Sequence, residues 1–240
     1  MCSTQIGRKL SVARCLKAVK AMKAFEPLNI AGMALSNRIM VPAMVTRLSG
    51  DDGFVNQNII DRYVRYAQGG IGLIVIEAMA VHHVKSGPLL RISDDKFVPG
   101  LTDLARRIHD TSDSKVVPQI IHFLKVAKSG WRQTIDMLSR DDIDRIVEEF
   151  GDAVARAREV GFDGAELHSA HAYTLSSFLS RTNPRQDDYG DTLEGRLRLI
   201  SRIMQDVRRK QAKIFRSACA TTPTSSSRGD TRSMMPRPSA

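Results

Sequence analysis

The sequence predicts an α/β fold of the (β/α)8 TIM-barrel type, in which residues 25–210 form about the first four βα units. Four short apolar runs alternate with four segments of helical periodicity, a pattern typical of a parallel sheet with connecting helices. Polar or conformationally special residues follow each run, and the carboxyl ends of barrel strands all open on one face. A doubly wound sheet also fits four units. No glycine-rich nucleotide-binding turn follows the first run, however, and this favours the barrel.

Each predicted strand is a short run of apolar and β-branched residues. The first, 38–44, ends at a turn that contains proline. The second, 72–81, is continuously apolar, as expected for a strand that is buried on both faces. The third spans 116–123, and the segment 161–168 is a tight turn that leads into the fourth strand.

Apolar residues at helical spacing predict a helix after each strand. Three of these helices are expected at 56–67, 101–108 and 193–207. The clearest helix follows Ser139, a good amino-terminal cap with two aspartates in the first turn, and it ends at Gly161.

The charge of the chain is concentrated at its two ends. A net charge of +10 and a pI of about 9.8 would by themselves suggest a nucleic-acid or membrane partner. Residues 1–24, however, hold six basic residues and no acid, and residues 211–240 hold five basic residues and one acid. The segment between them holds 25 basic and 25 acidic residues and is neutral. It therefore predicts no nucleic-acid partner and no membrane partner.

Cysteine and hydrophobicity narrow the class of protein. All three cysteines lie in the two ends, so the middle segment has no disulfide framework and no zinc-binding spacing. A reducing compartment, the cytoplasm, is the simplest expectation. No run of about 18 apolar residues occurs, so no transmembrane helix is predicted.

We expect neither end to belong to the folded core. Residues 1–24 form a basic extension, either a targeting segment or sequence that precedes the working start at Met22. Residues 211–240 are rich in Ser, Thr, Arg and Pro and have no apolar periodicity, so they are either disordered or translated in a shifted frame. The second explanation rests on the neighbouring frame, in which the codons of Met234-Met235-Pro236 must encode Asp-Ala.

The densest group of reactive side chains follows the fourth strand. His168 and His171 lie three residues apart, and Tyr173 comes two residues later. Two neutral imidazoles can donate hydrogen bonds to one oxygen, and a nearby phenol can deliver a proton. From these residues alone, a structural histidine pair and a metal-binding pair remain open as alternatives to a grip on a carbonyl or oxyanion.

A longer pattern surrounds this group. His168, His171 and Tyr173 form H-x-x-[HN]-x-Y, an FL pair follows, and N-x-R-x-D-x-Y-G-G-x-x-x-x-R comes a few residues later. The matching positions of the second and third parts are Phe178, Leu179, Asn183, Arg185, Asp187, Tyr189, Gly190 and Arg196. This pattern resembles the Old Yellow Enzyme family of FMN-dependent NAD(P)H:flavin oxidoreductases. The runs FEPLNIAGMALSNRIMVPAM, GLIVIEA and PQIIH are similar to that family's first three strand regions.

The sequence departs from the family pattern at three places. Asp191 stands where a second glycine is usual, and Gly195 where asparagine is common. The Gly-Arg that usually follows the third-strand histidine is replaced by residues 123–125, which are Phe, Leu and Lys.

The resemblance implies a role for each site residue. Pro42, Ala43, Met44 and Val45 would form the turn that contacts the flavin, Ala78 would leave room for its ring, and Gln119 would hydrogen-bond its pyrimidine end. His168 and His171 would hold the carbonyl oxygen of an enone or enoyl substrate. Tyr173 would protonate the α-carbon while the flavin gives hydride to the β-carbon, with NAD(P)H as the reductant. No metal ligand is implied.

Two main functions follow from these observations. The first is an FMN-dependent ene-reductase that acts on a small α,β-unsaturated carbonyl compound. The alternative is a catalytically dead half-barrel, because the family's phosphate-binding loops follow its seventh and eighth strands and four βα units do not reach them. Such a fragment could not hold FMN and would associate as a homo-oligomer through its sheet edges. A metal-dependent barrel lyase is a distant third.

Overall fold

The computed structural model describes residues 22–84, 87–127, 129–210 and 216–220, the last segment as backbone only. The predicted extension 1–24 therefore lies outside the described residues up to position 21. The predicted tail 211–240 also lies outside them, except for 216–220. Whether the tail comes from a shifted frame stays a prediction.

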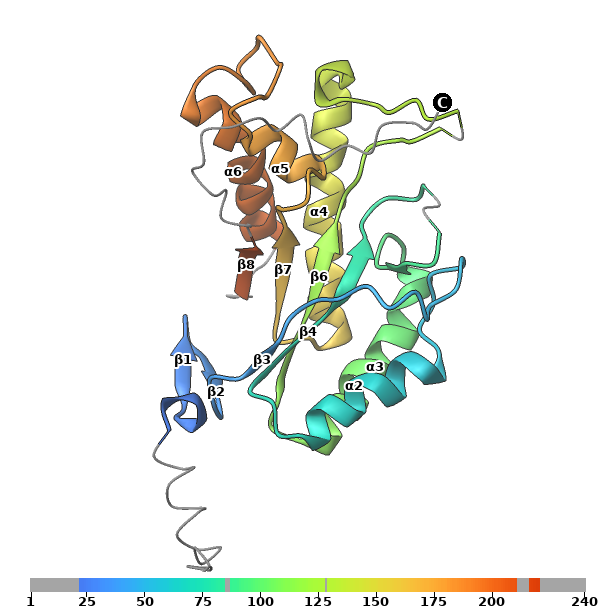
Figure 1. The fold of residues 1–240 in the computed structure, drawn as a ribbon, viewed down its shortest axis with the longest axis vertical. Coiled ribbons are helices and arrows are strands. Elements are labelled where there is room, and N and C mark those ends of the chain that lie inside the picture. Colours follow the sequence, from blue (N-terminus) through green and yellow to red (C-terminus); the bar gives the residue numbers. More distant parts are fainter. Residues whose placement is uncertain (1–21, 85–86, 128, 211–215, 221–240) are drawn as a thin grey trace, which may run out of the picture.

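A parallel sheet forms the centre of the fold (Figure 1). Its strands, in their order across the sheet, are β3 (Met40–Val41), β4 (Leu73–Ala80), β6 (Lys115–Ile121), β7 (Gly164–His168) and β8 (Arg216–Ala220). The short strand β5 (Leu90–Arg91) pairs with the end of β4. All these pairs are parallel, so the carboxyl ends of the strands share one edge of the sheet.

Four long helices connect the strands. They are α2 (Gln57–Gln68), α3 (Val98–Thr111), α4 (Arg140–Val160) and α6 (Leu193–Lys210). The Ser139 hydroxyl accepts from the Asp142 amide, and the Asp142 carboxylate accepts from the Ser139 amide, so α4 begins with a complete capping box. Gly161 ends α4 at a φ of 94°, a conformation that favours glycine. The predicted cap and stop of this helix are confirmed.

The helices cover one face of the sheet and share a single core with it (Figure 1). Ile59 of α2, Leu104 of α3, Phe150 of α4 and Ile203 of α6 are fully buried in this core. The strands contribute alternate side chains to it, as the two-residue repeat of a strand requires. The apolar spacing in the sequence therefore identified the inner face of each helix.

A bulge in β4 changes which side chains face the core. Ile76 and Met79 both pack on the helix side although they are three residues apart, and the pairing of β4 with β6 shifts register between them. Ala78 and Ala80 consequently share the opposite face, where they form a second small cluster with Ile121.

The structure also contains elements that the sequence did not predict. β1 (Leu28–Ile30) and β2 (Met33–Leu35) form an antiparallel hairpin outside the sheet, and α5 (Thr174–Leu179) follows the His168 loop. The first predicted strand, 38–44, is shortened to Met40–Val41 because Pro42 has no amide hydrogen for the ladder.

Within the tail 211–240, which the sequence predicts to be disordered or translated in a shifted frame, Arg216–Ala220 form a strand. These residues form β8, which pairs along the whole of β7. The pairing satisfies backbone amide and carbonyl groups that would otherwise form an open edge. The fourth predicted strand is therefore not the end of the sheet.

Candidate flavin and carbonyl site

His168, His171 and Tyr173 come together at the carboxyl edge of the sheet. His168 is the last residue of β7, and Tyr173 is the residue that precedes α5. The centroid of the His168 ring lies 5.1 Å from the centroid of the His171 ring and 5.1 Å from that of the Tyr173 ring. The His171 and Tyr173 ring centroids are 6.5 Å apart. His168 is 5% exposed, whereas Tyr173 is 39% exposed. The three rings therefore form one group, in which the imidazole of His168 is buried and the phenol of Tyr173 is exposed to solvent.

The loop that brings these rings together has an unusual backbone. His171 and Ala172 have φ values of 56° and 55°, in a region that costs a residue with a side chain about 1–3 kcal/mol. Two hydroxyls of α5 hold the loop: Ser176 donates to the Ala170 carbonyl at 2.9 Å, and Ser177 donates to the Ala172 carbonyl at 3.1 Å. Strain held in this way is typical of a site whose geometry matters.

Hydrogen bonds indicate the protonation of His168. The Ala170 amide donates to His168 Nδ1 at 3.3 Å, so the ring proton lies on Nε2. Burial, and then the nearby His171, lower the pKa of His168, which keeps the ring neutral. Its Nε2 lies 3.3 Å from His171 Nδ1. In this state the Nε2 proton of His168 is directed at His171 Nδ1.

The expectation that both imidazoles donate to one external oxygen stays a prediction. In the arrangement described here, His168 Nε2 is directed at His171 Nδ1 instead. An incoming carbonyl oxygen would have to take the place of His171 Nδ1 as the acceptor. A rotation of the exposed His171 ring would allow this exchange and leave both N–H groups on the oxygen.

Gln119 lies on the neighbouring strand and bonds to a residue that the sequence analysis did not place in the site. Gln119 and Glu166 are directly paired in register across β6 and β7. Gln119 Nε2 donates to Glu166 Oε1 at 2.7 Å. Burial raises the pKa of Glu166, although the bond from Gln119 lowers it in part. The two-residue spacing from His168 was the signal that could have found Glu166, because positions i and i+2 of a strand share a face.

Residues 42–45 form the turn after β3, next to β4. Met44 and Val45 are 55% and 49% exposed, so neither side chain belongs to the core. The turn is tied to β4 by Thr46, which donates to the buried carboxylate of Glu77 at 2.7 Å. These residues share the strand edge with the histidine group, but the described contacts do not join the two directly.

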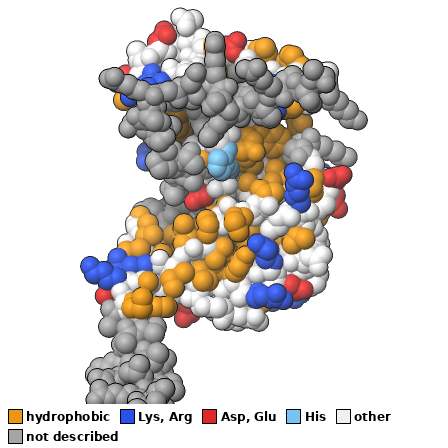
Figure 2. Space-filling view, viewed as in Figure 1, with side chains coloured by type: hydrophobic (Ala, Val, Ile, Leu, Met, Phe, Trp, Pro, Cys, Tyr) orange, Lys and Arg blue, Asp and Glu red, His pale blue; other side chains and the backbone are white. Residues whose placement is uncertain are grey.

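Ala78 belongs to the small cluster on the open face of the sheet. It packs there with Ala80 and Ile121, and the half-buried Phe123 lies against them. Figure 2 shows hydrophobic side chains spread across this side of the molecule near a histidine side chain. Ala78 and Ala80 are 2% and 0% exposed, so these small side chains lie buried against the sheet.

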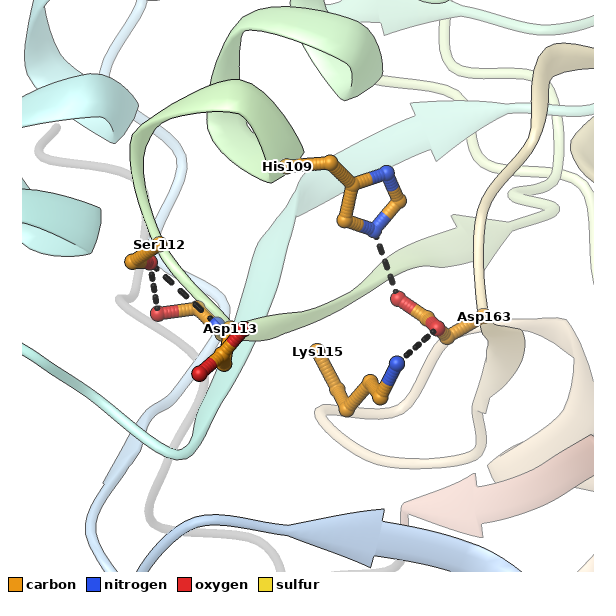
Figure 3. A pocket seen from close by; sticks show the side chains of 6 residues that line it. His109, Ser112, Asp113, Lys115 and Asp163 are labelled. Atoms are coloured by element: carbon orange, nitrogen blue, oxygen red, sulfur yellow. Dashed lines mark hydrogen bonds and ion pairs between the residues drawn. The ribbon is translucent and has the colours of Figure 1, made fainter.

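A separate polar hollow of about 310 Å³ opens near the starts of β6 and β7, at the opposite edge of the sheet (Figure 3). Asp163 lies on one side of it and accepts from His109 Nε2 at 2.8 Å and Lys115 Nζ at 3.0 Å. Burial would raise the pKa of Asp163, yet the hydrogen bonds from His109, Val116 and Lys115 bring it below its usual value. These charges satisfy one another and join α3 to the sheet, so we assign this hollow a structural role.

Comparison with known proteins decides the family. The model of the NADH:flavin oxidoreductase / NADH oxidase family matches residues 23–136 and 125–224. The chain belongs to this family. It is 34% identical over 205 residues to an NADH oxidase of Thermoanaerobacter brockii, covering 77% of this chain and 31% of that protein. It is 32% identical over 210 residues to an NADPH dehydrogenase of Bacillus subtilis, covering 78% and 60%. The chain thus spans 31% to 60% of the length of these relatives.

Solved structures show the same fold. The Old Yellow Enzyme of a Pichia species superposes with a TM-score of 0.75 at 20% identity, over 85% of this chain and 61% of that one. The Old Yellow Enzyme homologue of Zymomonas mobilis gives a TM-score of 0.70 at 21% identity, over 84% and 64%. The predicted fold class, part of a (β/α)8 barrel, is confirmed.

In this member of the NADH:flavin oxidoreductase family, the residues of the N-x-R-x-D pattern connect the end of α5 to the segment before α4. Arg185 is buried and donates to the carbonyl oxygens of Ile135 and Leu138 at 2.5 and 2.9 Å. Its guanidinium also bonds both oxygens of Asp187, which lowers the pKa of that carboxyl to about 2. Asn183 donates to the Phe178 carbonyl at the end of α5. These motif residues hold α5 in place.

No group of three or more His, Cys, Asp and Glu side chains that could hold a metal ion occurs among the described residues. Within the same part of the chain, no helix has the length and apolar character that a membrane crossing requires.

Proposed function

We propose that this chain carries the flavin-ring and substrate-carbonyl part of an FMN-dependent NAD(P)H oxidoreductase of the ene-reductase type. The observation that supports it best is the group formed by His168, His171 and Tyr173 at the carboxyl edge of the sheet. Membership of the NADH:flavin oxidoreductase family supports the cofactor and the reductant.

The residues present suit a flavin. Gln119 offers an amide at the sheet edge, the small Ala78 leaves room beside the ring, and Met44 and Val45 offer apolar surface that is otherwise exposed to water. When bound, FMN supplies the hydride chemistry, which it takes over from NAD(P)H. Pro42 and Ala43 complete the turn that would border the ring.

The side chains of the chain itself would hold the substrate and move a proton. The imidazoles of His168 and His171 would donate to the carbonyl oxygen of an enone and stabilise the negative charge that develops there. Burial lowers the pKa of His168, which favours its neutral form. Loss of one such donor typically lowers the rate by about 10²–10³. The phenol of Tyr173 would then deliver a proton to the α-carbon from its partly exposed position.

A second candidate is a fragment that cannot hold FMN. The described sheet has two end strands, β3 and β8, and is open rather than closed into a barrel. A flavin phosphate needs several donors or cations, because an unpaired buried dianion costs several kcal/mol. The family resemblance places those groups in the second half of the barrel, and this observation supports the alternative.

An absorbance experiment separates the two candidates. The purified 240-residue chain is mixed with excess FMN, then with NADH under anaerobic conditions, and finally with a small enone. The ene-reductase proposal expects the flavin band to bleach with NADH faster than free FMN does and to return on addition of the enone. A rate equal to that of free FMN supports the fragment. Bleaching without a response to the enone contradicts the choice of substrate.

A further inference from the structure

The amide of Gln119 has only one orientation that fits its neighbour. Gln119 and Glu166 lie opposite each other on adjacent parallel strands, and the distance from Gln119 Nε2 to Glu166 Oε1 is 2.7 Å. An ionised carboxylate accepts hydrogen bonds and cannot donate them. The NH₂ group of Gln119 must therefore face Glu166, and its carbonyl oxygen Oε1 must face the other way.

The carbonyl oxygen of Gln119 is left without a donor. Among the described residues, the Gln119 amide donates from Nε2 to Glu166, and its Oε1 accepts no hydrogen bond. Both side chains are only partly buried, so this oxygen remains within reach of a ligand. A free acceptor at the carboxyl edge of a parallel sheet lies where ligands bind in such folds.

The carboxylate of Glu166 is not needed for structure. It has no cationic partner among the described residues, and burial raises its pKa, so its ionised form lowers the stability of the fold. A glutamine at 166 could bond Gln119 equally well without this cost. A carboxylate at position 166 differs from an amide in one respect. The ionised carboxylate only accepts hydrogen bonds, whereas an amide also donates them and would allow Gln119 to bond in either orientation.

We propose that Glu166 is a positioning residue, which orients Gln119 so that Oε1 accepts a hydrogen bond from the imide N–H of the flavin pyrimidine ring. The inference rests on the proposed function, because it assumes that a flavin occupies this edge. It deepens that proposal by naming what the site selects: a ring that carries N–H, rather than N-alkyl, between its two carbonyl groups.

The test compares two ligands and two variants of the full chain. Riboflavin and its N3-methyl derivative are titrated against the wild-type protein, and flavin fluorescence reports the two dissociation constants. The matched control to Glu166→Gln is Glu149→Gln, since Glu149 is also a largely buried carboxylate, but it lies on α4 beside His122. We expect the preference for riboflavin to fall by about threefold to tenfold in Glu166→Gln and to stay unchanged in Glu149→Gln.

A second measurement does not depend on any variant at position 166. The side-chain NH₂ signal of Gln119 is assigned by NMR from its loss in Gln119→Leu, and riboflavin is then added to the wild-type chain. The proposal expects this NH₂ to stay bonded to Glu166, with little change in its proton shifts.

The outcomes are distinct. An unchanged ligand preference in a folded Glu166→Gln protein, or an NH₂ signal that moves to the flavin, overturns the role of Glu166 and leaves the proposed function standing. Failure of the wild-type chain to bind either flavin overturns the proposed function and this inference together.

Discussion

The side-chain oxygen of Thr174 lies 2.8 Å from Nδ1 of His122, and so the first residue of α5 is tied to the end of β6. The Thr174 amide also approaches the His122 carbonyl, at 3.4 Å. Because Thr174 follows Tyr173 directly, these contacts set where the phenol stands relative to the sheet. Burial lowers the pKa of His122 to about 3, with a further contribution from His82, so the imidazole that holds Thr174 is neutral.

Thr174→Val removes this hydroxyl and keeps the shape of the side chain. Thr174 is fully buried, so His122 Nδ1 loses its partner, which costs about 1–3 kcal/mol. We expect urea unfolding to show this loss, and proton delivery by Tyr173 to slow. Thr174→Ser keeps the hydroxyl and should restore most of both quantities. Equal losses in the two variants would contradict a role for the hydrogen bond.

The two histidines and the tyrosine should affect different steps. His168→Ala or His171→Ala removes a donor to the ligand oxygen, and we expect phenol or enone binding to the flavin-loaded chain to weaken about tenfold. Tyr173→Phe should change that binding little but slow enone reduction by about 10²–10⁴. Ligand titration and single-turnover kinetics measure the two quantities. His171→Asn, which keeps an N–H donor, is the control and should retain more binding than His171→Ala.

The chain should bind riboflavin and FMN with similar, weak affinity. On the proposed function, Gln119, Ala78, Met44 and Val45 would contact the flavin ring, whereas the resemblance places the phosphate-binding loops beyond the fourth βα unit. Fluorescence quenching gives the two dissociation constants, which we expect to differ by less than about threefold. A family member with a phosphate grip would prefer FMN by orders of magnitude. Tight one-to-one binding of FMN alone would refute this expectation.

Glu149 should make the stability of the fold depend on pH. Burial raises its pKa from 4.5 to about 7, while Arg145 opposes the shift and Asp152 adds to it. The imidazole of His122, the residue that follows β6, lies beside the carboxylate. The folded state therefore holds a proton between pH 4.5 and about 7 that the unfolded state has released. Stability contributed by this proton is present below pH 4.5 and is lost as pH rises towards 7.

The comparison with Glu149→Gln isolates this effect. The amide stays neutral at every pH, so the variant should match the wild type near pH 4.5 and exceed it by about 1–3 kcal/mol at pH 7.5. His122 and His82 have lowered pKa values and act in the opposite sense, but they are common to both proteins. Urea unfolding across this pH range measures the difference. A difference that does not change with pH would show that Glu149 titrates normally.

The fold class and the histidine group were predictable because they depend on local patterns. Apolar spacing predicted α2, α3, α4 and α6, and the cap at Ser139 predicted where α4 begins. The position of His168 at a strand end placed it on the edge where barrel strands open. Such signals persist because side-chain direction repeats every two residues in a strand and about every 3.6 in a helix.

Other features depend on which segments become neighbours, and the sequence carries no local signal for these. β8 forms by pairing its backbone with the edge of β7, although it lies in a segment that is rich in Ser, Thr, Arg and Pro and has no apolar periodicity. The Gln119–Glu166 and Thr174–His122 pairs join residues 47 and 52 positions apart, and the bulge after Ile76 decides that Ala78 faces the open side. Thus the sequence by itself determined the class of fold and the group of reactive side chains at the carboxyl edge of the sheet. Tertiary structure decided which partners orient them, because hydrogen-bond direction and register exist only once the strands are paired.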